Sequence, residues 1–188
     1  DANRYEALVK PLKKIKVEEL LEFPGGVIGC LEDKESRIVR FNKRNLEKYL
    51  TRIGHIPLPP YINRDDTARD RKEYQTVYAK YAGSVASPTA GLHFTNSLLA
   101  NLKKAGHGVV PLTLHINYGT FKPVECEDIV FHPMHSEDYS ISASGFVRVR
   151  KAKDHGRKIV AVGTTSCRVL EFVSENGQLS GSTNIFIY

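Results

Sequence analysis

A run of prolines at residues 56–62, Ile-Pro-Leu-Pro-Pro-Tyr-Ile, constrains the fold of this 188-residue chain more than any other feature. A proline fixes its own φ angle, lacks a backbone N–H group and disfavours the helical conformation of the residue before it. Three prolines within four positions therefore force an extended path. We expect this path to separate a first domain at residues 1–53 from a second domain at residues 54–188.

The residues before the prolines predict a β-rich domain. Short apolar runs between polar turns are typical of strands, and they fall at residues 5–9, 20–23, 27–31 and 37–41. Leu46, Tyr49, Leu50 and Ile53 then recur at helical spacing, and Gly54 follows them. We expect one amphipathic helix that ends at this glycine.

The residues after the prolines predict alternating helices and strands. Tyr74, Val77, Tyr78 and Tyr81 repeat the helical spacing beyond a polar loop at residues 63–73, and Thr95 is placed to cap a helix at residues 96–105. Residues 110–116 alternate as a strand does, and the apolar run at residues 159–162 predicts a buried parallel strand. With helices after residues 142 and 166 and a last strand at residues 184–188, the domain is expected to be α/β with a mixed sheet.

Residues 83–95 combine small residues, hydroxyls and one histidine with no charged side chain. Glycines such as Gly91 let a backbone approach a ligand closely, and Ser87 and Thr89 offer hydroxyls that donate and accept hydrogen bonds. His93 exchanges a proton near neutral pH. The stretch is a candidate substrate site, and the alternative is a tightly packed turn that leads into the next helix.

Residues 163–168, Gly-Thr-Thr-Ser-Cys-Arg, follow the predicted parallel strand and open a helix. Unpaired N–H groups and the helix dipole would point at one spot there and receive an anion, and Arg168 adds a guanidinium. The turn has no Walker motif, so a carboxylate or a ribose is as plausible a ligand for it as a phosphate. The alternative role for Arg168 is a structural partner for Glu171 or for a carbonyl. The candidate turn residues are Gly163, Thr164, Thr165 and Ser166.

Residues 132–137, His-Pro-Met-His-Ser-Glu, bring two histidines and a glutamate close together in the sequence. The proline between the histidines opposes the helical geometry of a His-Glu-x-x-His zinc site, so we expect no metal. His135 and Glu137 are instead candidates for an acid/base pair. A metal-assisted hydrolase that uses His132, His135 and His115 is kept as an alternative function.

The charge of the chain favours an anionic partner, since the net charge is +6 and the pI is about 9.2. The strongest basic patch lies on the predicted helix after residue 142. Its residues either contact RNA phosphates or form a solvated face. The tyrosines at residues 74–81 have two alternatives of their own, since either they belong to the core or one of them stacks on a base. The four basic residues are Arg148, Arg150, Lys151 and Lys153.

The cysteines and the hydropathy pattern favour a cytoplasmic protein. Cys30, Cys126 and Cys167 are far apart and include no Cys-x-x-Cys pair, which argues against a disulfide framework or a zinc knuckle. No apolar run in the sequence is long enough to span a bilayer. We therefore expect a reducing compartment and no membrane partner.

Five motifs and the proline run stand in the order seen in one family. The motifs are Tyr-Gln-Thr-Val-Tyr-Ala (74–79), Ala-Ser-Pro-Thr-Ala-Gly-Leu-His-Phe-Thr (86–95), Gly-Thr-Phe-Lys-Pro-Val (119–124), His-Pro-Met-His-Ser-Glu (132–137) and Ala-Val-Gly-Thr-Thr-Ser-Cys-Arg (161–168). The chain resembles the S-adenosylmethionine:tRNA ribosyltransferase-isomerases of queuosine biosynthesis. The match is firm over residues 53–188, and it implies a fragment that lacks the family's N- and C-terminal segments.

This resemblance implies an incomplete α/β main domain and, at residues 1–53, part of an inserted small β-barrel. The enzyme would move and isomerise the ribosyl group of S-adenosylmethionine onto the 7-aminomethyl-7-deazaguanine base of a tRNA anticodon. Adenine and methionine would leave, and epoxyqueuosine would remain. S-adenosylmethionine is then a ribosyl-donor substrate, tRNA is the partner, and a monomer is expected. Gly119 and Thr120, in the third matching motif, join the substrate-binding residues.

The implied chemistry needs a base for the carbon beside the sulfonium, an acid for departing adenine, and a site that orients two large substrates. We assign His93 as the acid or base nearest the ribose, with His135 and Glu137 as a second pair. His115 and His132 are further titrating groups, and the resemblance does not say which group acts. A non-catalytic RNA-binding module is the other alternative function.

Overall fold

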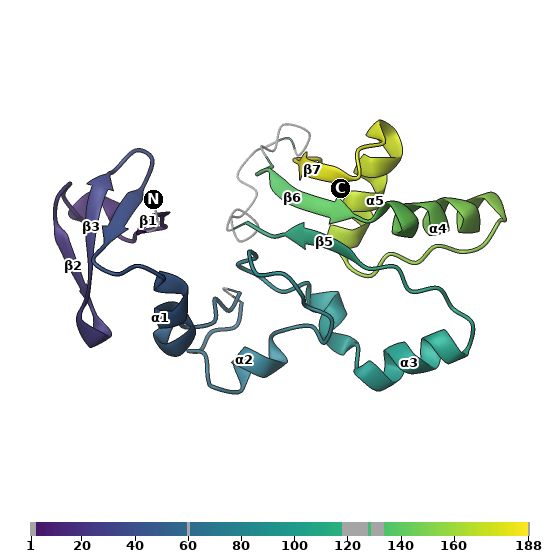
Figure 1. Ribbon diagram of the computed structural model, residues 1–188, viewed down its shortest axis with the longest axis horizontal. Helices are drawn as coiled ribbons and strands as arrows, with labels where there is room; N and C mark the ends of the chain where they lie inside the picture. Colours follow the sequence, from purple (N-terminus) through teal and green to yellow (C-terminus); the bar gives the residue numbers. More distant parts are fainter. Residues whose placement is uncertain (1–2, 60, 118–127, 129–133, 188) are drawn as a thin grey trace. The chain divides into compact units, whose positions relative to one another are not determined.

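The computed structural model describes residues 3–59, 61–117, 128 and 134–187, and the chain divides into two compact units (Figure 1). The first unit is Asp1–His55 and the second is Ile56–Tyr188. The division falls two residues beyond the boundary expected after residue 53, at the start of the proline run.

The first unit is an antiparallel sheet with a helix packed on it. Its four strands lie in the order β1-β4-β3-β2, so the described strands form an open sheet with β1 and β2 at its edges. The elements are β1 (Arg4–Glu6), η1 (Leu12–Lys14), β2 (Leu20–Phe23), η2 (Pro24–Gly26), β3 (Val27–Asp33), β4 (Ile38–Phe41) and α1 (Leu46–Ile53). The predicted strands and helix are therefore confirmed, although the first strand is shorter than expected.

The core of the first unit comes from alternate positions of its two central strands. Val27 and Leu31 of β3 and Val39 of β4 are almost fully buried, and Leu46 and Tyr49 of α1 pack against them. The Tyr49 hydroxyl donates a hydrogen bond to the carbonyl of Pro24. The predicted apolar stripe of α1 is too wide by one residue, because Leu50 is 48% exposed.

The described residues of the second unit form a sheet of three strands in the order β5-β6-β7, and both strand pairs in it are antiparallel. Glu137, Tyr139 and Ile141 of β6 are buried on one face, and the last two pack with Val169 and Val173 of α5. Helix α5 lies against the sheet in Figure 1. The elements are α2 (Asp70–Glu73), η3 (Thr89–His93), α3 (Asn96–Lys104), β5 (Leu112–His115), β6 (Glu137–Ile141), α4 (Ala143–Asp154), α5 (Thr164–Asn176) and β7 (Ser180–Thr183).

Helix caps agree with the sequence. The Thr95 hydroxyl accepts a hydrogen bond from Leu98 N at 3.1 Å and starts α3, and the Ser142 hydroxyl does the same for α4 through Gly145 N at 3.1 Å. Both helices are followed by a left-handed glycine, Gly106 after α3 and Gly156 after α4. The predicted starts of these helices are confirmed.

Two apolar runs that were predicted as strands, residues 159–162 and the described part of residues 184–188, are not strands. Residues 159–162 have no strand partner among the described residues, and Val160 is 80% exposed, so the described part of the sheet is antiparallel and not mixed. The last strand is β7 at residues 180–183 instead of 184–188, since Ser180 and Thr183 pair with Ser140 and Glu137. A short apolar run in the sequence does not reveal whether a neighbouring strand pairs with it.

The tyrosine stripe at residues 74–81 is not a helix. Helix α2 ends at Glu73, and Tyr74 leaves the helical region with φ −90° and ψ 39°. The Gln75 side chain accepts a hydrogen bond from Thr76 N at 2.9 Å, and such a side-chain bond competes with the helical backbone pattern. Tyr78 and Tyr81 are 44% and 61% exposed, so the interpretation that these tyrosines form core was wrong for both residues.

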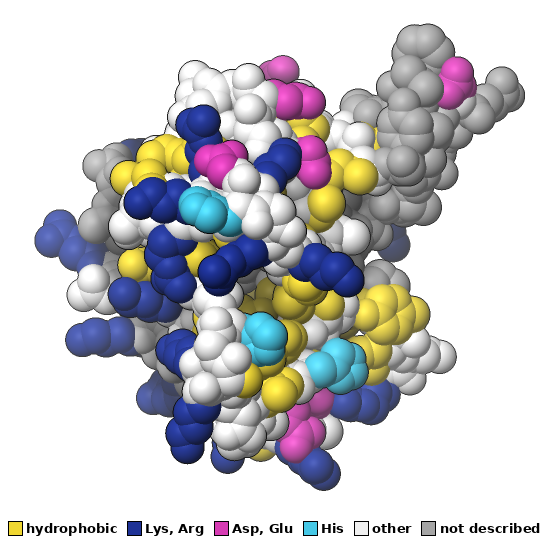
Figure 2. All heavy atoms as spheres, turned by 90° about the vertical axis from the view of Figure 1, so that its right-hand side faces the viewer, with side chains coloured by type: hydrophobic (Ala, Val, Ile, Leu, Met, Phe, Trp, Pro, Cys, Tyr) yellow, Lys and Arg dark blue, Asp and Glu magenta, His cyan; other side chains and the backbone are white. Residues whose placement is uncertain are grey.

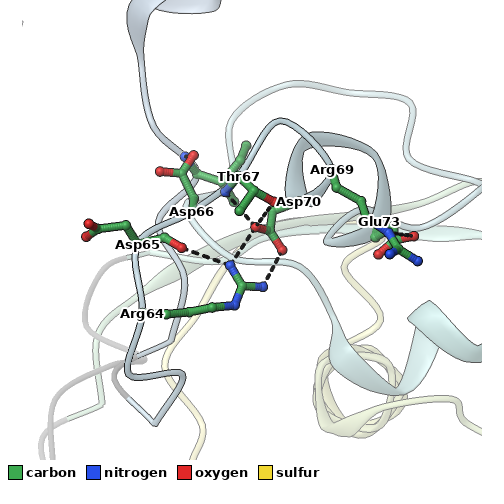
Figure 3. Close-up of polar contacts among 8 residues, drawn as sticks. Arg64, Asp65, Asp66, Thr67, Arg69, Asp70 and Glu73 are labelled. Atoms are coloured by element: carbon green, nitrogen blue, oxygen red, sulfur yellow. Dashed lines mark hydrogen bonds and ion pairs between the residues drawn. The ribbon is translucent and has the colours of Figure 1, made fainter.

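The polar stretch before α2 is ordered by a buried aspartate, which the sequence did not reveal (Figure 3). Asp70 accepts two hydrogen bonds from the guanidinium of Arg64, both at 2.7 Å, and two more from the backbone and hydroxyl of Thr67. Arg64 and these donors hold the pKa of the Asp70 carboxyl well below its usual value. Asp66 Oδ2 also accepts a bond from Ile56 N at 2.9 Å, which ties the stretch to the proline run.

Candidate functional site

Residues 83–87 lie along the outer side of β5, near its end. Val85 N donates to the carbonyl of Ile116 at 3.0 Å. The Ser84 hydroxyl accepts from Ile116 N at 3.1 Å and donates to the carbonyl of Leu114 at 3.3 Å. Because β5 is an edge strand of its sheet, the small-residue stretch takes up part of its free backbone edge.

Gly83 is required where the stretch meets His115. Its φ of +139° is a conformation that residues with a side chain rarely adopt, and an added Cβ would stand 2.7 Å from His115 Nδ1. His115 pairs with Asp138 across the sheet, while Leu112 and Leu114 pack toward α5. His115 therefore belongs to the face of the sheet opposite α5.

Two buried polar atoms in this region lack a hydrogen-bond partner among the described residues. They are the hydroxyl oxygen of Ser87 and Nδ1 of His115. Ser87 is only 8% exposed. Buried polar groups in proteins nearly always have a partner, so each of these atoms requires an explanation.

Gly91 is explained by packing. An added Cβ would overlap the hydroxyl of Tyr78 and stand 2.9 Å from Thr76 Cγ2. Burial raises the pKa of this Tyr78 hydroxyl. The segment after α2 is thus fitted against η3, and the glycine serves this contact whether or not it also approaches a substrate.

The turn before α5 leaves the start of the helix without a side-chain cap. Gly163 has φ 89° and ψ 151°, and α5 has no side-chain cap at its start. Ser166 donates its hydroxyl to the carbonyl of Val162 at 2.9 Å, so it does not cap the helix. A Cβ on Gly163 would lie 3.8 Å from Cβ of Ala90. The structure therefore brings the two predicted substrate segments, around η3 and at the start of α5, next to each other.

Arg168 and Glu137 form a buried ion pair between α5 and the start of β6. Their side chains are 14% and 3% exposed, and Arg168 Nη1 binds Glu137 Oε2. Asn117 N donates to the other carboxylate oxygen at 3.2 Å, and the Asn117 side chain donates to the carbonyl of Ser136 at 2.6 Å. The sequence suggested Glu171 or a backbone carbonyl as the partner of Arg168, but the partner in this pair is Glu137. Glu137 is itself a predicted catalytic residue.

The remaining candidates differ in exposure. His93, His135, Thr89 and Thr164 are exposed, whereas Thr165 is half-buried. Gly119, Thr120 and His132 lie outside the described residues. Asn117 was not assigned to the site from the sequence, although its position at the end of an alternating strand would have allowed this.

The basic residues of α4 are exposed on the surface of the helix. Arg148, Arg150, Lys151 and Lys153 are all exposed, and Arg148 Nη1 also donates to the carbonyl of Val109 at 3.4 Å. Figure 2 shows Lys and Arg side chains gathered on the face of the second unit toward which the end of α4 points. This arrangement suits a polyanion.

Two further findings concern metals and membranes. Within the described part of the chain, no three His, Cys, Asp or Glu side chains come together as metal ligands. Among the described helices, none is both long and apolar enough to cross a bilayer.

The comparisons with known proteins agree on one family. The queuosine biosynthesis protein family matches residues 2–188. The chain is 46% identical over 195 residues to the S-adenosylmethionine:tRNA ribosyltransferase-isomerase of Finegoldia magna, which covers 99% of this chain and 56% of that protein. Proteins of the same name from Sulfurihydrogenibium sp. and Clostridioides difficile are 42% and 46% identical, with 99% and 100% of this chain and 56% and 57% of theirs covered. The chain therefore spans little more than half the length of these curated relatives. No solved structure matches it.

Proposed function

Because the chain belongs to the queuosine biosynthesis protein family, we propose that its protein transfers and isomerises the ribosyl group of S-adenosylmethionine onto the 7-aminomethyl-7-deazaguanine base of tRNA. Adenine and methionine leave, and epoxyqueuosine forms in the tRNA. The observation that carries this proposal is the family match over residues 2–188, together with relatives at 42–46% identity that bear the enzyme's name. Those names favour a transferase over the metal-assisted hydrolase and the RNA-binding module.

The donor's methionine carboxylate binds at the start of α5 in this proposal. The uncapped N–H groups that follow Gly163 supply donors, and the helix dipole favours a negative charge there. Ala90 of η3 stands beside the same turn, so Thr89 and Gly91 flank the donor from the other side. Thr164, Thr165 and Ser166 belong to this turn, and Gly119 and Thr120 complete the proposed set.

Arg168 takes a double role in this arrangement. Since its Nη1 is held by Glu137, the guanidinium is fixed in place before the donor arrives. A fixed guanidinium binds a carboxylate without the entropy cost of ordering a long side chain. Glu137 then orients Arg168 in addition to its proposed part in proton transfer.

The proton transfers are assigned to His93, and to His135 with Glu137 as the second pair. The two histidines are exposed, so a substrate reaches their rings without a change in the fold. His93 lies at the end of η3, in the small-residue segment whose Ala90 is next to Gly163, and this favours it as the group nearest the transferred ribose. Burial of Glu137 excludes it from direct exchange with solvent.

The tRNA contacts the exposed basic residues of α4 in this proposal. Arg148, Arg150, Lys151 and Lys153 are exposed on one helix, and a net charge of +6 steers a polyanion toward the protein. We place the protein in the cytoplasm, where its tRNA substrate is found, and we propose that it is a monomer. The sheet of the first unit corresponds to part of the family's small inserted β-barrel.

The activity is tested by adenine release in the protein at its natural length. Purified protein is mixed with S-adenosylmethionine and with tRNA that carries 7-aminomethyl-7-deazaguanine, or with the same tRNA carrying guanine. The proposal predicts adenine release with the modified tRNA only. Release that is equal with both tRNAs, or absent with both, would contradict it.

A further inference from the structure

Two serines three residues apart differ sharply in their hydrogen bonds. The Ser84 hydroxyl binds two backbone atoms of the β5 edge, Ile116 N and the Leu114 carbonyl. The Ser87 hydroxyl is buried, with less than 1 Å² of exposed surface, and has no partner among the described residues. The first serine fixes the segment to the sheet, and the second makes no contribution of this kind to the fold.

His115, on the neighbouring strand β5, also has a buried polar atom without a hydrogen-bond partner among the described residues. Its Nδ1 is buried without a partner, and the backbone of Gly83 packs against the ring. In contrast, Nδ1 of His155 lies 2.6 Å from the carbonyl of Lys151. Because Nδ1 of His115 has no such bond, it can serve a ligand as a donor in one tautomer and as an acceptor in the other.

A buried polar atom without a partner destabilises the folded chain, because it has lost its hydrogen bonds to water. Two such atoms on adjoining segments are explained if a ligand supplies the missing bonds. The contacts of residues 83–87 named above are with backbone atoms of β5, and Gly83 packs against the His115 ring. Asp138 stands opposite His115 across the sheet, and its carboxylate accepts a hydrogen bond from the Ser182 hydroxyl. A carboxylate at this place disfavours an anionic ligand group. These surroundings favour a neutral ligand group that both donates and accepts, as a sugar hydroxyl does.

We infer that the Ser87 hydroxyl and His115 Nδ1 bind the ribose hydroxyls of the donor nucleoside. This inference rests on the proposed function and adds His115 to the residues that contact the substrate. Neither atom is exposed, so binding needs a local opening. The bonds of Ser84 and Val85 to β5 keep the start of the segment in place during this opening.

The serine pair supplies a matched test of stability. Ser84→Ala removes a satisfied hydroxyl and should lower the melting temperature by about 2–4 °C. Ser87→Ala removes an unsatisfied one and should not lower it. A drop for Ser87→Ala as large as that for Ser84→Ala would overturn the inference, because the hydroxyl would then have a partner within the ligand-free protein.

The ligand is tested by calorimetric titration of the protein at its natural length with adenosine and with 2′,3′-dideoxyadenosine. Ser87→Ala and His115→Phe should each weaken adenosine binding about 3- to 10-fold, the loss of one hydrogen bond, and leave the dideoxy compound unaffected. His115→Asn, which retains a polar nitrogen near the Nδ1 position, should restore most of the affinity.

The outcomes separate the inference from the proposed function. If the wild-type protein binds S-adenosylmethionine but the two substitutions weaken adenosine by less than threefold, the inference fails and the function stands. If the wild-type protein binds neither adenosine nor S-adenosylmethionine, both fail. Equal losses for adenosine and its dideoxy analogue would also overturn the inference, because the substitutions would then act on the shape of the site and not on the ribose hydroxyls.

Discussion

At the scale of single residues, the ion pair of Arg168 and Glu137 links the proposed donor site to the sheet. Both side chains are mostly buried, so the pair contributes mainly through the cost of breaking it. A lone glutamate left in this position would be a buried charge without compensation. Substitutions at Arg168 are therefore expected to change the stability of the fold as well as the proposed binding of the donor.

We expect Arg168→Ala to lower the free energy of unfolding by about 3–5 kcal/mol. The double variant Arg168→Ala/Glu137→Gln should recover part of this loss, because the remaining amide carries no charge. Urea unfolding measures the free energy of unfolding of the single and the double variant. Additive losses in the double variant would show that the two side chains are not coupled.

His93 is tested by a substitution that separates hydrogen bonding from proton transfer. Glutamine keeps a hydrogen-bonding group but does not exchange protons near neutral pH, so His93→Gln should slow adenine release about 100- to 10,000-fold. Single-turnover kinetics with both substrates saturating give this rate, and a melting curve controls for folding. A loss of less than about tenfold would make His93 a structural residue.

Gly91 is explained by its contact with Tyr78. Gly91→Ala should cost about 1–3 kcal/mol of stability, since its Cβ would overlap the Tyr78 hydroxyl. In a Tyr78→Phe background the same substitution should cost less, because the overlapping oxygen is absent. The same loss in both backgrounds would mean that another contact, such as that with Thr76, sets the cost.

At the scale of elements, the sequence predicted what local patterns determine. The caps at Thr95 and Ser142 are properties of one turn of helix, so they could be identified without knowing the fold. The strand predicted at residues 27–31 was also identified, since its alternate residues face one core, and in the structure it extends to residue 33. Each of these signals is complete within a few consecutive residues.

The errors lie where a pattern needs a distant partner. The tyrosine spacing at residues 74–81 matches a helix, but Tyr78 is held by a glycine in a later segment. Residues 159–162 have the composition of a buried strand, and no neighbouring strand is present among the described residues. Within the candidate site, the neighbours Ala90 and Gly163 and the pair Arg168 and Glu137 come from segments far apart in sequence, which spacing does not connect.

The stretch before α2 gives a prediction about pH. The pKa of Asp70 is lowered in the folded chain, so its contribution to stability is present above the pKa of the unfolded state, about 4, and is lost as the pH falls below it. Asp70→Asn should therefore flatten the loss of stability in acid. Asp65→Asn is the control, because Asp65 is exposed and binds Arg64 only through its backbone carbonyl. Urea unfolding between pH 5 and pH 2 compares them, and the same acid dependence in Asp70→Asn and wild type would contradict the assignment.

At the scale of the whole molecule, the effect of net charge on tRNA binding can be separated from the effect of where the basic residues lie. Replacing Arg150, Lys151 and Lys153 of α4 by glutamine should reduce the slope of log affinity for tRNA against log salt by about 2–3, if each contacts a phosphate. The control replaces Lys14, Arg44 and Lys48 of the first unit, which are equally exposed and carry the same charge. Equal flattening in both variants would assign the effect to net charge alone.

The central claim is that the protein uses S-adenosylmethionine as a source of a ribosyl group. The most direct measurement follows two labels into tRNA, one in the ribose of the donor and one in its methyl group, with tRNA that carries 7-aminomethyl-7-deazaguanine. The account predicts that the ribose label enters the tRNA in equal amount to the adenine released, and that the methyl label leaves with methionine. Methyl label in the tRNA, or adenine release without ribose label in the tRNA, would contradict it.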